Sequence, residues 1–351
     1  MLTSYAKDGD NINGECRIDN YELLIISSTL PNLYSPNTSP FFIINYQLFS
    51  VDFIHKKVAL DYSPIFSILI PSWNNIDYLK CVVNSIKKNS RYKHQIIVHV
   101  NEGNDGSEDW VIAQGDISYT KSSQNSGVCY GFNAASHLAT AEYLVFIDDD
   151  MYLCPDWDFY LFEEVERQKD DKWCISGTMI EGFDKGNACV IADKNYGTHP
   201  SEFNEEKFLA EYATYPKEDW NGSQWYPMVL PTFVYRAVGG LSVEFFPGMY
   251  SDPDFMIKLW HYGVRYYKGL GKSRVYHFAS RSTGRVKRND GRTEFILKWG
   301  LSSNTFFKNY LKIGTKFLGK LPAPEENFTL RLKKRIDRWK VKFKSRPIDI
   351  G

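Results

Sequence analysis

The spacing of hydrophobic and polar residues becomes regular at about residue 65. Residues 66–70 form an apolar run that is typical of a buried strand, and Pro71 ends it. The apolar positions that follow recur at the spacing of one face of an amphipathic helix: Leu79, Val82, Val83 and Ile86. This segment therefore predicts a strand followed by a helix that packs on it.

The same alternation continues up to about residue 150. Further strands are predicted at 95–100, 117–120 and 143–147, and a helix of small residues runs from Ser126 to Ala139. Strands that alternate with helices favour a parallel sheet covered on both faces. The fold class is therefore α/β.

The second half of the chain is less regular. Its predicted elements are a helix at 159–167, a strand at 173–180, a loop-rich segment at 182–231, a helix at 255–262 and a short strand at 275–278. Gly263 suits the C-terminal end of the helix at 255–262.

The two ends of the chain predict smaller additions. Residues 1–63 hold three candidate strands, at 21–26, 41–44 and 57–60, and indicate an accessory β-rich extension. Residues 64–285 form the main α/β domain, and residues 286–351 a helical tail.

The tail contains a basic amphipathic helix. Leu332, Ile336, Trp339 and Phe343 form an apolar stripe, and the surrounding positions from Arg331 to Lys344 are rich in lysine and arginine. Two interpretations stay open: a terminal helix docked on the core with a solvated basic face, or a helix that contacts an anionic membrane surface.

Composition narrows the class of protein. The 351 residues carry no formal net charge, which gives no indication of nucleic-acid binding. The six cysteines form no C-x-x-C pair and predict reduced thiols. Neither a signal peptide nor an apolar run long enough to span a membrane is visible, so we expect a cytoplasmic protein, at most peripheral on the inner face of the membrane. The oligomeric state is not indicated.

The residues most suggestive of chemistry are Asp148, Asp149 and Asp150. They follow the strand at 143–147, at the strand end where open α/β sheets bind ligands. Adjacent carboxylates repel one another, and a hard divalent cation such as Mg²⁺ or Mn²⁺ would relieve that repulsion. A solvated acidic loop is the competing interpretation.

Further polar residues lie in or beside the other predicted strands and helices. Their alternative roles are structural: turns, helix caps, helix packing, a hydrogen-bonded core histidine and solvated loop charges. These segments are Pro71-Ser72-Trp73-Asn74, Asn101-Glu102, Asn125-Ser126-Gly127 with Asn133, Tyr250-Ser251-Asp252-Pro253-Asp254, His277, and the basic Arg281 and Arg285.

The order of these segments resembles the family 2 glycosyltransferases, over about residues 66–284. The resemblance implies a GT-A fold, a Rossmann-like and mostly parallel sheet flanked by helices, and inverting transfer from a nucleotide-diphosphate sugar. It also implies that Asp150, with Asp148 and His277, binds Mn²⁺ or Mg²⁺. Asp252 would be the general base, with Ser251 where the family usually has Glu.

By the same resemblance, a further set of residues would bind the donor: Pro71, Ser72, Trp73, Asn101, Glu102, Asn125, Gly127, Asn133, Asp148 and Asp149. Arg281 and Arg285 suit diphosphate oxygens. Asn101 and Glu102 stand where the family usually carries Asp, which leaves the nucleobase open, with uridine expected.

The expected reaction is sugar transfer to a hydroxyl of a glycan or lipid-linked acceptor, in the synthesis of surface polysaccharide or lipopolysaccharide. The alternative is a non-catalytic protein that binds a glycan or a nucleotide on the same fold. Turnover of a nucleotide sugar would distinguish the two.

Overall fold

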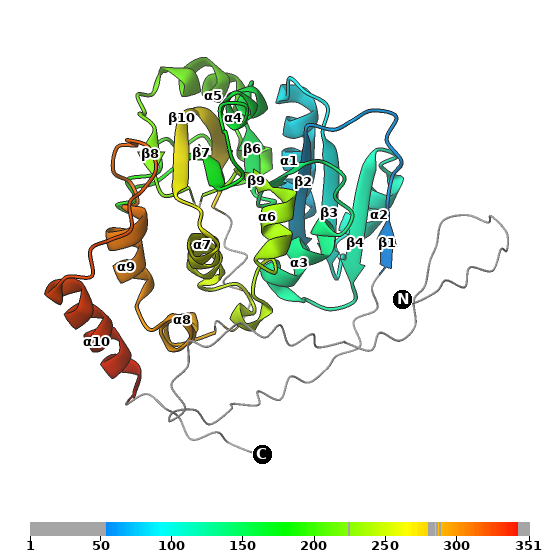
Figure 1. The fold of residues 1–351 in the computed structure, drawn as a ribbon. Coiled ribbons are helices and arrows are strands. Elements are labelled where there is room, and N and C mark those ends of the chain that lie inside the picture. Colours follow the sequence, from blue (N-terminus) through cyan, green and yellow to red (C-terminus); the bar gives the residue numbers. More distant parts are fainter. Residues whose placement is uncertain (1–53, 224, 280–284, 286, 288, 343–351) are drawn as a thin grey trace.

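The computed structural model describes residues 54–223, 225–279, 285, 287 and 289–342. Within this part of the chain, one sheet has the strand order β1-β4-β3-β2-β5-β9-β7-β10-β6, and β8 pairs with β10 (Figure 1). The strands are β1 (Ile54–Lys56), β2 (Phe66–Trp73), β3 (Gln95–Asn101), β4 (Ile117–Ser122), β5 (Tyr143–Phe146), β6 (Met151–Leu153), β7 (Trp173–Glu181), β8 (Trp220–Asn221), β9 (Met228–Pro231) and β10 (Tyr266–His277).

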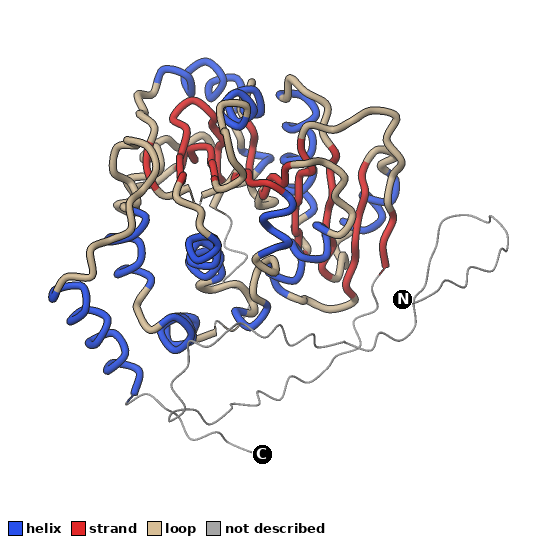
Figure 2. The backbone as a smooth tube through the Cα atoms, in the orientation of Figure 1, coloured by secondary structure: helices blue, strands red, loops and turns tan. Residues whose placement is uncertain are grey.

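Most helices connect the strands and cover the sheet, and α8, α9 and α10 follow the last strand (Figure 2). They are α1 (Ile76–Asn89), α2 (Ser107–Ala113), α3 (Gly127–Ser136), α4 (Trp157–Val165), α5 (Glu205–Glu211), α6 (Thr232–Ala237), α7 (Ser251–Tyr262), α8 (Gly291–Trp299), α9 (Ser303–Phe306) and α10 (Phe328–Lys342). The apolar face predicted for α1 is the one that it buries, because Leu79, Val82 and Val83 are fully enclosed.

The run β4-β3-β2-β5 is parallel, as the alternation of strands and helices predicts. β7 and β10 are also parallel, and β9 lies antiparallel between β5 and β7. The predicted α/β class with a mostly parallel sheet and flanking helices is confirmed.

Two strand predictions are corrected. The segment 182–231, predicted as loop-rich, also contains β8 and the buried strand β9, which is too short for its period to be recognised. β10 starts at Tyr266 and not near 275, and its register shifts between Gly269 and Arg274. A Cβ at Gly269 would lie 1.9 Å from the ring of Trp220, so glycine is required where that ring covers the strand.

At the N-terminal side, the predicted strand at 57–60 is wrong. The strand there is β1, which pairs with the edge strand β4 of the main sheet. The strands predicted at 21–26 and 41–44 lie outside the described residues.

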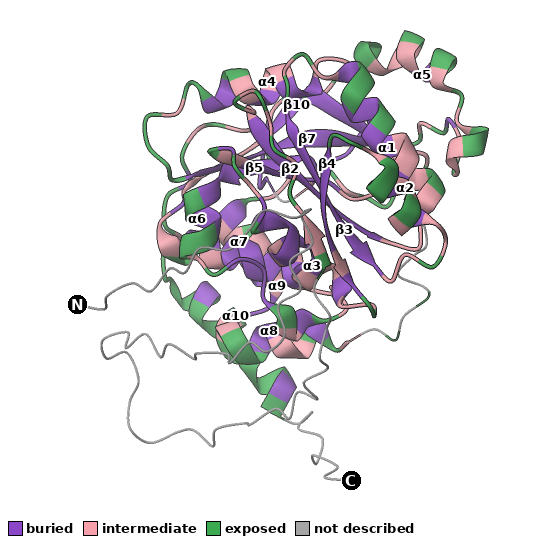
Figure 3. Ribbon diagram, turned by 90° about the vertical axis from the view of Figure 1, so that its right-hand side faces the viewer, coloured by how far each residue is buried: buried purple, intermediate pink, exposed green. Residues whose placement is uncertain are grey.

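The C-terminal segment packs on the same hydrophobic core as the sheet, through Phe295, Leu301, Phe306 and Leu311. Figure 3 shows the buried strands in purple and α10 with most of its surface exposed. None of the helices in the described ranges is long and apolar enough to cross a membrane.

Candidate active site

A pocket of about 380 Å³ opens at the C-terminal ends of β2, β3 and β5. Most of the predicted site residues line it: Pro71, Ser72, Trp73, Asn101, Asn125, Gly127, Asp148, Asp149, Asp150, Asp252 and His277. Side chains from separate strands and from α7 therefore meet in one cavity, as expected at this edge of an α/β sheet.

The acidic triplet lies between two fixed points of the sheet. The Ile147 N–H donates to the Leu69 carbonyl oxygen at 3.1 Å, and the Phe278 N–H donates to the Asp150 carbonyl oxygen at 3.0 Å. The first bond extends the pairing of β5 with β2, and the second ties the start of β6 to the residue after His277. Asp148 and Asp149 occupy the short connection between these points.

Asp149 holds the loop together. Its carboxylate accepts hydrogen bonds from Ser72 Oγ at 2.7 Å and from Asn75 Nδ2 at 3.1 Å. Burial, followed by the charge of Asp150, raises the pKa of Asp149 to about 7, and the two hydrogen bonds oppose that rise. Asp149 thus joins the triplet to the turn after β2.

Asp148 has no such partner. In the described part of the chain, its carboxylate accepts no hydrogen bond from side chain or backbone. Burial and then the charge of Asp150 raise the pKa of Asp148 well above its ordinary value, although His277 opposes them. A cation that binds nearby would stabilise the ionised form of such a buried carboxylate, which no hydrogen bond stabilises in the free protein.

His277 is oriented by a residue that the sequence did not single out, Glu181. The two residues are register partners at the ends of β10 and β7, and His277 Nδ1 lies 2.7 Å from Glu181 Oε1. His277 Nε2 lies 3.5 Å from Asp150 Oδ2. Burial lowers the pKa of His277, but Asp150 and Glu181 outweigh it and raise the pKa to about 10. In the sequence, Glu181 directly follows the predicted strand at 173–180, and this position could have identified it as a candidate site residue.

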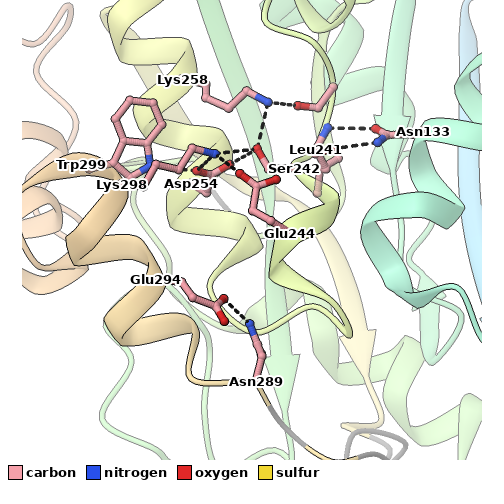
Figure 4. Close-up of polar contacts among 11 residues, drawn as sticks. Asn133, Leu241, Ser242, Glu244, Asp254, Lys258, Asn289, Glu294, Lys298 and Trp299 are labelled. Carbon is pink, nitrogen blue, oxygen red and sulfur yellow. Dashed lines mark hydrogen bonds and ion pairs between the residues drawn. The ribbon is translucent and has the colours of Figure 1, made fainter. Parts of the chain in front are cut away.

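Asp252 faces the cavity from the first turn of α7. Burial raises its pKa to about 6, and none of the described residues donates a hydrogen bond to its carboxylate. Asp254, two residues later, is fully buried and anchored. It accepts from Ser242 Oγ at 2.6 Å and from Trp299 Nε1 at 2.8 Å, and it pairs with Lys298 at 2.8 Å (Figure 4). Asp254 therefore fixes the start of α7 while Asp252 stays open to the pocket.

Residues 67–212 match the family model described as Glycosyl transferase family 2. This segment is a family 2 glycosyltransferase domain. The resemblance seen in the sequence is thereby confirmed. Asp252 and His277 lie beyond the matched segment, so their roles rest on the geometry of the pocket.

Solved structures show a distant likeness to this chain. S. aureus TarS 1–349 in complex with UDP has 12% identity and a TM-score of 0.43 over 60% of this chain and 59% of that one. S. aureus TarS has 11% identity and a TM-score of 0.49 over 82% and 46%. GalNAc-T7 with UDP, GalNAc and Mn²⁺ has 14% identity and a TM-score of 0.49 over 71% and 50%.

This chain thus spans about half to 60% of the length of these structures. Likeness at this level carries no information on the substrate. No curated protein matches the sequence.

The acidic side of the pocket has the features of an incomplete cation site. Among the described residues, no group of three or more His, Cys, Asp or Glu side chains forms a metal centre as it stands. Mg²⁺ is typically held by one or two carboxylates, with substrate phosphates and water completing an octahedron at about 2.1 Å, so neighbouring ligand atoms lie about 3 Å apart. The 3.5 Å between His277 Nε2 and Asp150 Oδ2 is close to that spacing, and Glu181 orients the imidazole as such ligands require.

The opposite side of the pocket is built from loops that hydrogen-bond to one another. Glu102 accepts from Trp73 Nε1 at 3.0 Å, from Asn74 Nδ2 at 2.9 Å and from the Asn125 N–H at 3.2 Å. Glu102 is not among the residues that line the pocket. It holds the turns after β2 and β4 in place.

Two further residues support the same loops. Asn101 Oδ1 accepts from the Ser126 N–H at 3.0 Å and from Ser126 Oγ at 2.7 Å. Gly127 has φ +79, and a Cβ there would lie 2.7 Å from Phe246, so the backbone approaches that loop closely.

Three predicted donor contacts differ in outcome. Asn133 does not line the pocket, because its amide is paired with the backbone of Leu241 at 2.8 and 2.9 Å (Figure 4). Arg285 donates to the Trp73 carbonyl oxygen at 2.8 Å and stacks 4.3 Å above the ring of Trp73, so it closes the β2 turn. Arg281 lies outside the described residues.

A second pocket of about 190 Å³ shares Asp148, Asp252 and His277 with the first. Trp225 and Asn187 line it, and Lys185 lines both pockets. Trp220 does not line either of these two pockets, because it is buried over Gly269. The second pocket therefore extends the cavity beyond Asp252.

Proposed function

We propose that this chain is an inverting glycosyltransferase that uses a nucleotide-diphosphate sugar, with uridine as the expected base. The acceptor would be a hydroxyl of a glycan or lipid-linked glycan, in surface polysaccharide or lipopolysaccharide synthesis. The observation that carries the proposal is the meeting of Asp148, Asp150, His277 and Asp252 in one pocket. Carboxylates with raised pKa values in a cleft are typical of reaction sites.

In the proposed reaction, the acceptor hydroxyl attacks C1 of the donor sugar and its proton moves to the Asp252 carboxylate. The bond from C1 to the diphosphate oxygen breaks, and the nucleoside diphosphate leaves with the bonding electrons. A pKa of about 6 makes Asp252 a stronger base than an ordinary Asp while leaving it largely ionised at pH 7. The second pocket, which adjoins Asp252, would hold the acceptor.

A divalent cation, Mn²⁺ or Mg²⁺, would be held by Asp150, with Asp148 and His277, and would supply Lewis-acid stabilisation of the departing diphosphate. Glu181 keeps His277 Nδ1 engaged, so Nε2 is the nitrogen that faces Asp150. On the other side, Trp73 and Asn101 line the pocket beside the expected nucleoside, with positions fixed by Glu102 and Ser126.

The experiment is a thermal-shift screen of nucleotide sugars with Mn²⁺, followed by an assay of nucleoside-diphosphate release. A donor at 100 times its Kd adds about 2.7 kcal/mol to the free energy of unfolding. We expect release of the nucleoside diphosphate from the best donor, loss of release in chelator, and its return with Mn²⁺. The Asp150→Ala variant should lose both the Mn²⁺-dependent shift and the release.

Binding of a donor without release of nucleoside diphosphate, with or without added acceptors, would favour a non-catalytic protein. Release that is unchanged in chelator would remove the cation from the proposal.

A further inference from the structure

The C-terminal helix α10 packs on the protein through an unusual face. Its buried residues are Leu330, Asp337 and Val341. Asp337 Oδ2 accepts from the Ser302 N–H at 2.9 Å and from Thr305 Oγ1 at 2.7 Å, at the start of α9. A buried and hydrogen-bonded carboxylate therefore fixes the rotation of α10 about its axis.

That rotation directs the apolar stripe of the helix outward. Leu332, Ile336 and Trp339 are 43%, 42% and 62% exposed. Leu332 and Trp339 each follow a packed residue by two positions, which is about 200° around an α-helix. The stripe thus lies opposite the packed face. α10 is docked on the protein with its basic residues exposed, as one of the two interpretations expects, but the residues that it buries are not those of the stripe.

Basic residues border the stripe. Arg331, Lys333, Arg335, Arg338, Lys340 and Lys342 are all exposed. None of these six takes part in an ion pair within the described chain, whereas the partly buried Lys334 pairs with Glu326. The outward face of α10 therefore combines exposed apolar side chains with basic side chains that form no ion pair among the described residues.

We propose that this face binds an anionic lipid surface. Leu332, Ile336 and Trp339 would enter the boundary between headgroups and acyl chains, while the basic residues contact lipid phosphates. Reversible binding to a membrane usually needs two signals, apolar insertion and charge attraction, and this face offers both. A nucleic acid would use the charges but would leave the apolar stripe exposed to water.

The proposal concerns only the outward face of α10 and does not depend on sugar transfer. α10 lies at one end of the molecule, on the side of α8 and α9, and α2 lies at the other side (Figure 1). This placement supplies control positions that are far from the helix. Ile112 on α2 is 45% exposed and matches Ile336 in type and exposure, and Lys57 is an exposed lysine beside β1.

The test is co-sedimentation of the full chain with vesicles of phosphatidylcholine, with and without phosphatidylglycerol. We expect binding only to the anionic vesicles, and weaker binding as salt is added. Ile336→Ser should weaken binding about tenfold and Lys333→Glu at least roughly fivefold. Ile112→Ser and Lys57→Glu should leave it unchanged, and all four variants should keep the wild-type thermal unfolding temperature.

Three results would overturn the proposal. One is equal binding to vesicles with and without phosphatidylglycerol. Another is equal binding by the Ile336→Ser and Ile112→Ser variants. The third is a wild-type dimer that binds no vesicles and that Ile336→Ser converts to monomer, which would make the stripe an interface between two copies.

Discussion

The two sides of the pocket are stabilised in opposite ways. On the β2–β3 side, Glu102 and Asn101 are saturated with hydrogen bonds from neighbouring loops. On the acidic side, Asp148 and Asp252 face the cavity without hydrogen bonds from the described residues, and burial raises the pKa of each. The polar groups of the first side already have their hydrogen bonds in the free protein. The carboxylates of the second side would be stabilised only when a cation or a donor group binds to them.

Asp252→Asn is the sharpest test of that difference. The amide cannot take a proton from an acceptor hydroxyl, so we expect kcat to fall by about 10² to 10⁴-fold. The unfolding temperature should stay the same or rise, because the lost charge has no hydrogen bond to lose. Steady-state kinetics and thermal unfolding measure the two effects.

The matched control is Asp109→Asn, an exposed Asp in the first turn of α2. It should change neither quantity. Wild-type kcat in the Asp252→Asn variant would refute the assignment of the base.

Glu181→Gln tests the acidic side through its supporting residue. A neutral partner holds His277 less firmly, and we expect the affinity for Mn²⁺ to fall by about 10 to 100-fold. Titration of the unfolding temperature with Mn²⁺ measures this. Glu163→Gln, at an exposed position on α4, is the control. Equal Mn²⁺ curves for both variants would mean that Glu181 only packs against the strand.

Glu102→Gln should destabilise the loops on the β2–β3 side of the pocket. Loss of the charge weakens the bonds from Trp73, Asn74 and Asn125, at a cost of about 1 to 3 kcal/mol in the free energy of unfolding. Denaturant unfolding measures this cost. We expect the KM for the donor to rise while Mn²⁺ affinity is unchanged. A loss of kcat without a loss of stability would contradict the division between the two sides.

The smallest expected effect is on the pH dependence. Burial raises the pKa of Asp252 from 3.8 to about 6, so the folded protein holds this proton more tightly than the unfolded chain does. The contribution of Asp252 to the free energy of unfolding is therefore present below about pH 4 and is lost as the pH rises through 6. Activity, which needs the ionised form, should rise over the same window.

Urea unfolding of wild type and Asp252→Asn at several pH values between 4 and 7 measures the difference. The gap between them should move in favour of the Asn variant as the pH rises. Parallel curves would mean that Asp252 is as well solvated in the folded protein as in the unfolded chain.

Much of the fold follows from local pattern. The strand at 66–70 and the helix after it were predictable because their apolar residues are periodic and Pro71 marks the turn. β9 was not predictable, since its four residues gain their strand character only from β5 and β7 on either side. The register shift in β10 begins at Gly269, where the ring of Trp220, distant in the sequence, covers the strand.

The site residues also divide into those that local sequence pattern reveals and those that only tertiary contacts reveal. Asp148, Asp150, Asp252 and His277 could be chosen from the sequence because each stands at the end of a predicted strand or the start of a helix. Glu181 was missed because its role appears only when β7 and β10 pair in register. Asn133 was assigned to the donor because its partner, Leu241, lies 108 residues away and no local pattern reveals it.

The short connection that carries Asp148 and Asp149 has a mechanical consequence. Its first end is bonded to β2 through Ile147, and its second end is bonded to the chain just after His277 through Asp150. Asp150 and His277 are therefore held next to each other by the pairing of β6 with β10. Asp148 and Asp149 form the direct connection from this pair of strands to β2 and β5, so the distance between the first and third carboxylates depends on how the two parts of the sheet are aligned.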